Sequence, residues 1–70
     1  MEHSEPHINF ARNLVAEMER QGLTQTGLAR KAGMSQSSLA RLIKGQVSPT
    51  IDSADNLART LGRHLADMLK

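Results

Sequence analysis

Apolar residues recur every three or four positions along the chain, the spacing of helices with one buried face. Phe10, Leu14 and Met18 stand four residues apart, and the stretch that contains them ends before Gly22. This pattern predicts a first helix from about Phe10 to Gln21, with Asn9 as its N-cap. The chain has one aromatic residue and no sustained alternation of apolar and polar positions, so no strand is predicted.

Four further helices follow from capping residues and helix-ending glycines. Thr24, Ser35 and Thr50 are suited to N-caps. Pro49 indicates that no helix continues through "GQVSPT". We expect helices from Thr24 to Gly33, from Ser35 to about Gly45, from Thr50 to Gly62, with Ile51, Leu57, Ala58 and Leu61 on its apolar side, and from about His64 to Leu69. The prediction is an all-α, compact five-helix domain over residues 9–70, preceded by a flexible tail of residues 1–8.

Length and composition exclude several kinds of protein. Seventy residues make one small domain, and without cysteine there is no disulfide or thiolate metal site. His3 and His7 alone are an incomplete metal site, so no cofactor is expected. No apolar run approaches the roughly 18 residues of a membrane span and no signal peptide is visible, so we expect a cytoplasmic protein without a membrane partner. No catalytic set of residues is visible, and we expect neither an enzyme nor an added sensor domain.

The charge is distributed unevenly along the chain. The formal net charge is only +2, but no acidic residue lies between Arg20 and Ile51. The same window holds Arg30, Lys31, Arg41 and Lys44. A surface that is merely solvated usually mixes both signs, so this cationic centre favours an anionic partner.

The second and third predicted helices are joined by Gly33, Met34 and Ser35 alone. So short a connection requires the two helices to cross steeply, and a steep crossing needs a small residue at the contact. Ala29 lies four residues before the glycine, and Gly33 can adopt the left-handed conformation that the turn needs. The spacing predicts a helix-turn-helix with Ala29 and Gly33 as its structural residues.

The run "LTQTGLARKAGMSQSSLARLIKGQVSPT", followed by "LARTLG" and "LADML", resembles the Cro and phage-repressor family of helix-turn-helix domains, also called the XRE family. The likeness covers roughly Phe10 to Leu69. The residues that stand at the family's spacings are Gln25, Leu28, Ala29, Gly33, Leu39, Leu42 and Gly45. The proline after the third helix and the Leu-Gly ending of the fourth match as well. The resemblance implies a lambda-repressor-like fold that binds double-stranded DNA.

In this family the third helix enters the major groove with its first residues on base edges. Gln can bond bidentately to adenine, Arg can bond bidentately to guanine, and Ala is small enough to touch a thymine methyl group. The implied base contacts are Gln36, Ser37, Ala40 and Arg41, and the implied phosphate contacts are Gln25, Ser38, Lys44 and Gln46. For Arg30 and Lys31 both a phosphate contact and a solvated surface stay open.

The resemblance implies a transcriptional regulator, with a repressor that binds a pseudo-palindromic operator as a homodimer as the leading hypothesis. Leu65, Met68 and Leu69 are the candidates for the dimer contact. The alternative is an antitoxin or other protein-interaction module with the same fold, which would also have a protein partner.

Two departures from the family pattern stand out. Where many members pair an arginine of the first helix with a glutamate of the third, this chain has Met18 and Ile43, which predicts an apolar contact. The sequence "GRHL" leaves the start of the last helix open.

Overall fold

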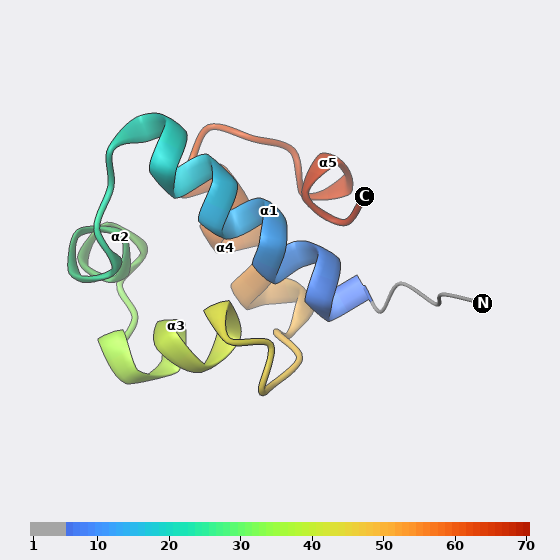
Figure 1. Ribbon diagram of the computed structural model, residues 1–70, viewed down its shortest axis with the longest axis horizontal. Coiled ribbons are helices and arrows are strands. Elements are labelled where there is room, and N and C mark those ends of the chain that lie inside the picture. Colours follow the sequence, from blue (N-terminus) through green and yellow to red (C-terminus); the bar gives the residue numbers. More distant parts are fainter. Residues whose placement is uncertain (1–5) are drawn as a thin grey trace.

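The computed structural model describes residues 6–70 and contains five helices (Figure 1). They are α1 (Pro6–Gln21), α2 (Gln25–Ala32), α3 (Gln36–Ile43), α4 (Ile51–Thr60) and α5 (Leu65–Met68). No strand occurs within these residues. The all-α prediction is confirmed, and four of the five helices begin within one or two residues of their predicted starts.

The predicted start of the first helix is wrong. α1 begins at Pro6, so neither a start at Phe10 nor an N-cap at Asn9 is correct. A proline suits the first turn of a helix, because its fixed φ matches helical backbone and its missing N–H would have no partner inside the helix. Asn13 then bonds outside its own helix, where its side-chain amide donates to the carbonyl oxygen of Met68 at 2.8 Å. Residues 1–5 of the predicted tail lie outside the described residues.

The helix ends follow from local chemistry. Thr24, Ser35 and Thr50 are N-caps whose hydroxyl oxygens accept from the backbone N–H three residues on, as predicted. The first four helices all end with the same two backbone hydrogen bonds, which close over a glycine with positive φ. This arrangement is the Schellman motif, and it satisfies carbonyl groups that a helix end otherwise leaves open. His64 is the N-cap of α5 but makes no side-chain capping bond.

One core joins all five helices. Its fully buried large side chains are those of Phe10, Leu14, Leu28, Leu39, Leu57 and Met68. Met18 lies in this core and Ile43 packs against it, so an apolar arrangement takes the place of the family's ion pair. Met68 is 2% exposed, and its predicted role in a dimer contact is therefore corrected to a role in the core. The predicted inward position of Ile51 is wrong as well, because its side chain is 73% exposed.

The helices are arranged around α1, which crosses the middle of the molecule with α4 behind it (Figure 1). In that view α2 is seen nearly end-on while α3 lies across it, so the two cross steeply, as the short turn predicts. α3 packs on both α2 and α1, and α5 packs on α1 and α4. None of the helices within residues 6–70 has the length and apolar character needed to cross a bilayer.

Candidate nucleic-acid interface

The turn between α2 and α3 fixes how α3 is presented. Gly33 has φ +69°, and its N–H donates to Arg30 O at 3.2 Å while the N–H of Met34 donates to Ala29 O at 2.9 Å. A side chain at Gly33 would meet no atom within 4 Å, so the backbone conformation alone calls for glycine here. Ser35 then starts α3, since its Oγ accepts from the N–H of Ser38 at 3.1 Å.

The inner sides of the two helices hold this crossing in place. Ala29 is 3% exposed at the α2 side of the contact, and Leu39 and Leu42 are buried on the α3 side. From α4, the side-chain amide of Asn56 donates to the carbonyl oxygen of Ala32 at 2.7 Å. The last turn of α2 is thus tied to α4 as well as to α3. Ala29 and Gly33 have the structural places that the sequence predicts.

The outer side of α3 carries polar groups that have no partner within the chain. Gln36, Ser37 and Arg41 are exposed, and Ala40 is half-buried at the edge of the same surface. Within residues 6–70, no side-chain hydrogen bond or ion pair engages Gln36, Ser37 or Arg41. Donors and acceptors on this surface are therefore free to bond to another molecule.

The four predicted phosphate contacts lie on α2, on α3 and in the loop after α3. Gln25 is the first residue of α2 and Lys44 is the residue that caps the C-terminus of α3. Gln46 is exposed in the loop that follows. Ser38 is exposed too, but its hydroxyl accepts from the hydroxyl of Ser35 at 2.9 Å, so part of its bonding capacity is used inside the chain. We call the exposed side chains of Gln25, Gln36, Ser37, Arg41, Lys44 and Gln46 the α3 face.

A hollow beside Arg41 was not predicted from the sequence. It has a volume of about 180 Å³ and lies between α3 and the N-terminus of α4. Its polar lining includes the hydroxyl groups of Ser48, Thr50 and Ser53. Thr50 and Ser53 already bond to each other, since the hydroxyl of Thr50 donates to Ser53 Oγ at 3.0 Å. The serine and proline of "VSPT" signalled a loop in the sequence, but not one that lies against Arg41.

A charged network away from this face was not predicted from the sequence either. Glu17 is 6% exposed, and its carboxylate accepts from Arg20, from Gln21 at 2.7 Å and from Arg63 at 3.3 Å. Hydrogen bonds from Arg20 and then from Gln21 lower the pKa of Glu17, although its burial acts in the opposite direction. The pairing with Glu17 raises the pKa of Arg20. An acidic residue between Leu14 and Met18, on the buried side of a helix, is the only local signal of this network.

Charges are distributed differently on the two sides of the molecule. Arg20, Arg59, Arg63 and Lys70 each have a carboxylate within 4 Å. Within the described residues, no such partner exists for the four cations of α2 and α3 and their ends: Arg30, Lys31, Arg41 and Lys44. The cationic window predicted from the sequence is therefore an uncompensated positive surface in the fold.

Comparison with known proteins places this geometry in a family. A helix-turn-helix family model matches residues 14–68, which is most of the chain. A protein described as an uncharacterized HTH-type transcriptional regulator from Methanothermobacter thermautotrophicus is 39% identical over 59 residues, covering 81% of this chain and 86% of that protein.

The fold has a counterpart among solved structures. The crystal structure of the hypothetical transcription factor NHTF from Neisseria superposes with a TM-score of 0.88 over 100% of this chain and 84% of that one, at 18% identity. That likeness concerns the fold alone, whereas the family match and the Methanothermobacter relative concern the sequence. Together with the capped turn and the steep crossing of α2 and α3, they show that the chain belongs to the XRE-type helix-turn-helix family of DNA-binding transcriptional regulators.

Proposed function

We propose that this protein is a repressor that binds a pseudo-palindromic operator as a homodimer, with α3 of each copy in the major groove. The observation that carries the proposal is the α3 face. It combines base-reading side-chain types with unpaired cations, on a short helix that the core and the turn hold rigidly.

The roles of the residues follow from their chemistry. Gln36 and Ser37 lie in the first turn of α3, where a helix that enters the major groove brings its side chains to base edges. Gln36 would bond to adenine, and Arg41, one turn later, would bond to guanine. Each such bidentate pair is worth about 1–3 kcal/mol of discrimination against the wrong base. Ala40, half-buried at the edge, would reach only a thymine methyl group that approaches closely.

Phosphate contacts would fix the position of α3 in the groove. Gln25 stands at the N-terminus of α2, where free backbone N–H groups and the positive end of the helix dipole favour an anion. Lys44 and Gln46 would hold the strand at the other end of α3. Ser48 and Ser53, which line the hollow beside Arg41, add hydroxyl groups in the same region. Ser38 would contribute with a hydroxyl that Ser35 already shares.

A dimer is proposed because one such helix reads only a few base pairs. Two copies related by a two-fold axis would place their recognition helices about one DNA turn, roughly 34 Å, apart. Of the predicted C-terminal dimer contacts, Leu69 is 38% exposed and Leu65 is half-buried against the core. The predicted C-terminal contact therefore offers little exposed apolar surface, from Leu69 with a smaller part from Leu65.

The experiment that tests the function is selection of bound sequences from a randomised duplex library at about physiological salt. We expect enrichment of a two-fold-symmetric motif with half-sites one turn apart. Repetition with Gln36→Ala and Arg41→Ala assigns positions, since each variant should lose preference at its own one or two base pairs. A library that shows no enrichment with the wild-type protein would contradict sequence-specific binding.

A further inference from the structure

The side of α1 that faces away from the core carries two opposite charges without partners. Arg12, Ala16 and Glu19 are exposed and Val15 is half-buried, and their spacing places all four on one stripe of the helix. Within residues 6–70 neither Arg12 nor Glu19 has an ion pair or a side-chain hydrogen bond. The two are seven residues apart, which is about 10 Å along the helix axis, so they cannot pair with each other.

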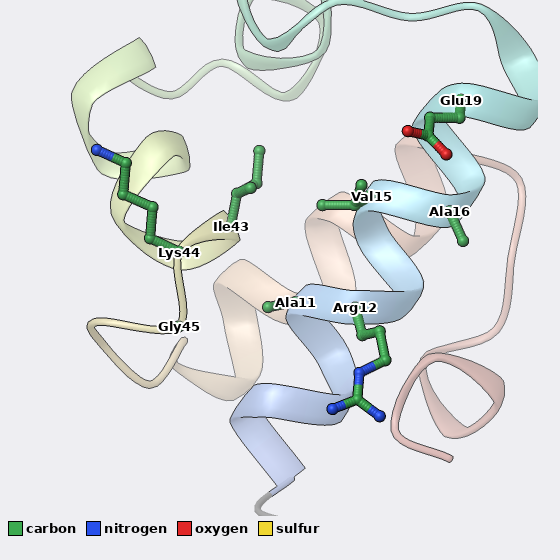
Figure 2. A pocket seen from close by; sticks show the side chains of 8 residues that line it. All are labelled: Ala11, Arg12, Val15, Ala16, Glu19, Ile43, Lys44 and Gly45. Atoms are coloured by element: carbon green, nitrogen blue, oxygen red, sulfur yellow. The ribbon is translucent and has the colours of Figure 1, made fainter.

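This stripe forms one wall of an open groove of about 550 Å³ between α1 and the end of α3. In Figure 2 the side chains of Val15 and Ile43 point into the space between the two helices. Arg12 and Glu19 lie at opposite ends of the stripe in the same view. The surface is thus apolar at its centre, where Ala16 has only a small side chain, and it is charged with opposite signs at its two ends.

We propose that this stripe, Arg12–Val15–Ala16–Glu19, replaces the predicted C-terminal contact as the surface through which two copies of the chain associate, with their α1 helices packed antiparallel about a two-fold axis. A two-fold contact must be complementary to itself. An axis between Val15 and Ala16 places Arg12 of each copy opposite Glu19 of the other, because both charges lie equally far from it along the chain. Val15 then faces the small Ala16 of the partner copy.

A second copy fits this stripe better than an unrelated protein does. The same surface, rotated by 180°, places an opposite charge at both charged ends of the stripe at once. The antiparallel arrangement forms two reciprocal ion pairs and covers Val15 and part of Ile43. The contact is small, and small interfaces give weak, reversible association. The proposal rests on the proposed function, since it supplies the contact between copies that a two-half-site operator requires. The α1 contact can nevertheless fail while DNA binding by α3 stands.

Charge reversal provides the test. We expect sedimentation equilibrium of the full chain without DNA to show a monomer–dimer equilibrium, and Arg12→Glu or Glu19→Arg alone to weaken dimerisation by about tenfold or more, because each places like charges opposite each other twice. The double variant should restore wild-type association, because it rebuilds both pairs with the signs exchanged. Lys31→Glu, an equal charge change on α2, should leave the equilibrium unchanged.

These variants should not harm the fold. Both positions are exposed, an acid near the N-terminal half of α1 and a base near its C-terminal end suit the helix dipole, and circular dichroism verifies the helix content. Ala16→Cys gives a second measurement, since the chain has no cysteine of its own. A short bifunctional maleimide should cross-link this variant to a dimer, while Thr26→Cys on α2 should remain monomeric.

The inference is overturned by any of three results: no association and no cross-link at Ala16→Cys, a double variant as weak as the single ones, or loss of the dimer in Leu69→Asp but not in Glu19→Arg. DNA binding is measured separately on a duplex with one half-site. A protein that binds this duplex but does not dimerise through α1 overturns the α1 contact and leaves DNA binding by α3 standing, whereas a protein that binds no duplex overturns the proposed DNA-binding function itself.

Discussion

The helix-turn-helix side of the molecule and the side that supports it differ in whether their cations are paired with carboxylates. On the supporting side, formed by α1, α4 and α5, four of the five cations, Arg20, Arg59, Arg63 and Lys70, have carboxylates nearby, and within the described residues Arg12 has none. On α2 and α3 the cations have none within the described residues. Exposed ion pairs add little stability, so their absence on α2 and α3 costs the fold little. It leaves that surface positive and free to bind phosphate and base edges.

Polar side chains show the same division. Asn13, Gln21 and Asn56 each donate to a backbone carbonyl far away in the sequence, and so tie α1 to α5, α1 to the end of α4, and α4 to α2. Gln25 and Gln36 have the same kinds of groups but no partner of this sort among the described residues. Amides on the supporting side hold helices together, and those on the α3 face remain available.

The largest effect is expected from the buried side of α3. Leu39 is fully buried, so Leu39→Ala should lower the free energy of unfolding by about 2–5 kcal/mol. Urea denaturation followed by circular dichroism measures this loss. The exposed neighbour variant Ser37→Ala is the control and should change stability by no more than about 0.5 kcal/mol. Equal stability of the two variants would mean that α3 is not anchored by this side.

The comparison of cations is sharpened by Arg41→Ala and Arg59→Ala. The first removes an unpaired cation of the α3 face and should weaken binding to the selected operator by about 1–3 kcal/mol. The second removes a cation paired with Asp55 at 2.9 Å and should leave operator affinity unchanged. Fluorescence anisotropy with labelled duplex measures both. Equal losses in the two variants would indicate general charge attraction rather than base recognition.

The turn is tested with two glycines of matching conformation. Gly33 and Gly62 have φ of +69° and +74°, and neither has an atom that would block a new side chain. Replacing either by Ala should therefore cost a similar conformational free energy, about 1–2 kcal/mol of stability. Only Gly33→Ala alters the crossing of α2 and α3, so only this variant should lose operator affinity in conditions where both are folded. A matching loss of affinity in Gly62→Ala would remove the special role of the turn.

A smaller effect is expected from a single phosphate contact. Lys44→Ala should weaken binding on every sequence and make the slope of log affinity against log salt shallower by about one unit. Lys70, which pairs with Asp67 at 3.6 Å, provides the control, because Lys70→Ala should leave the slope as it is. Titrations at several salt concentrations give both slopes. An unchanged slope in Lys44→Ala would exclude this residue from the phosphate contacts.

The Glu17 network predicts a gentle pH dependence on the supporting side. Because the pKa of Glu17 is lowered from 4.5, its contribution to stability is fully present above that pH and is lost as the pH falls through the lower folded-state value. Thermal unfolding at a series of acidic pH values should show this loss. Glu17→Gln should be less stable at neutral pH and should lose less stability on acidification. A variant with the wild-type pH profile would show that the network does not contribute.

The sequence predicts a feature well when the residues that produce it are close together along the chain, and poorly when they are far apart. The starts of α2, α3 and α4 were predictable because Thr24, Ser35 and Thr50 bond to groups three residues away. The start of α1 was missed because the apolar repeat begins at Phe10 whereas the helix includes the turn before it. The exposure of Gln36, Ser37 and Arg41 followed from periodicity, whereas Ala40 is half-buried, and which of them touch DNA stays a prediction.

The sequence by itself determined the helices except the start of α1, the turn at Gly33 and the acid-free window, because capping, glycine conformation and charge order act between near neighbours. Only the tertiary structure decided that Met68 belongs to the core while Ile51 is exposed, that Arg63 reaches Glu17, and that Arg41 borders a hydroxyl-lined hollow. These features join residues that are distant along the chain. Their positions depend on how five helices pack at once, and no local pattern determines that.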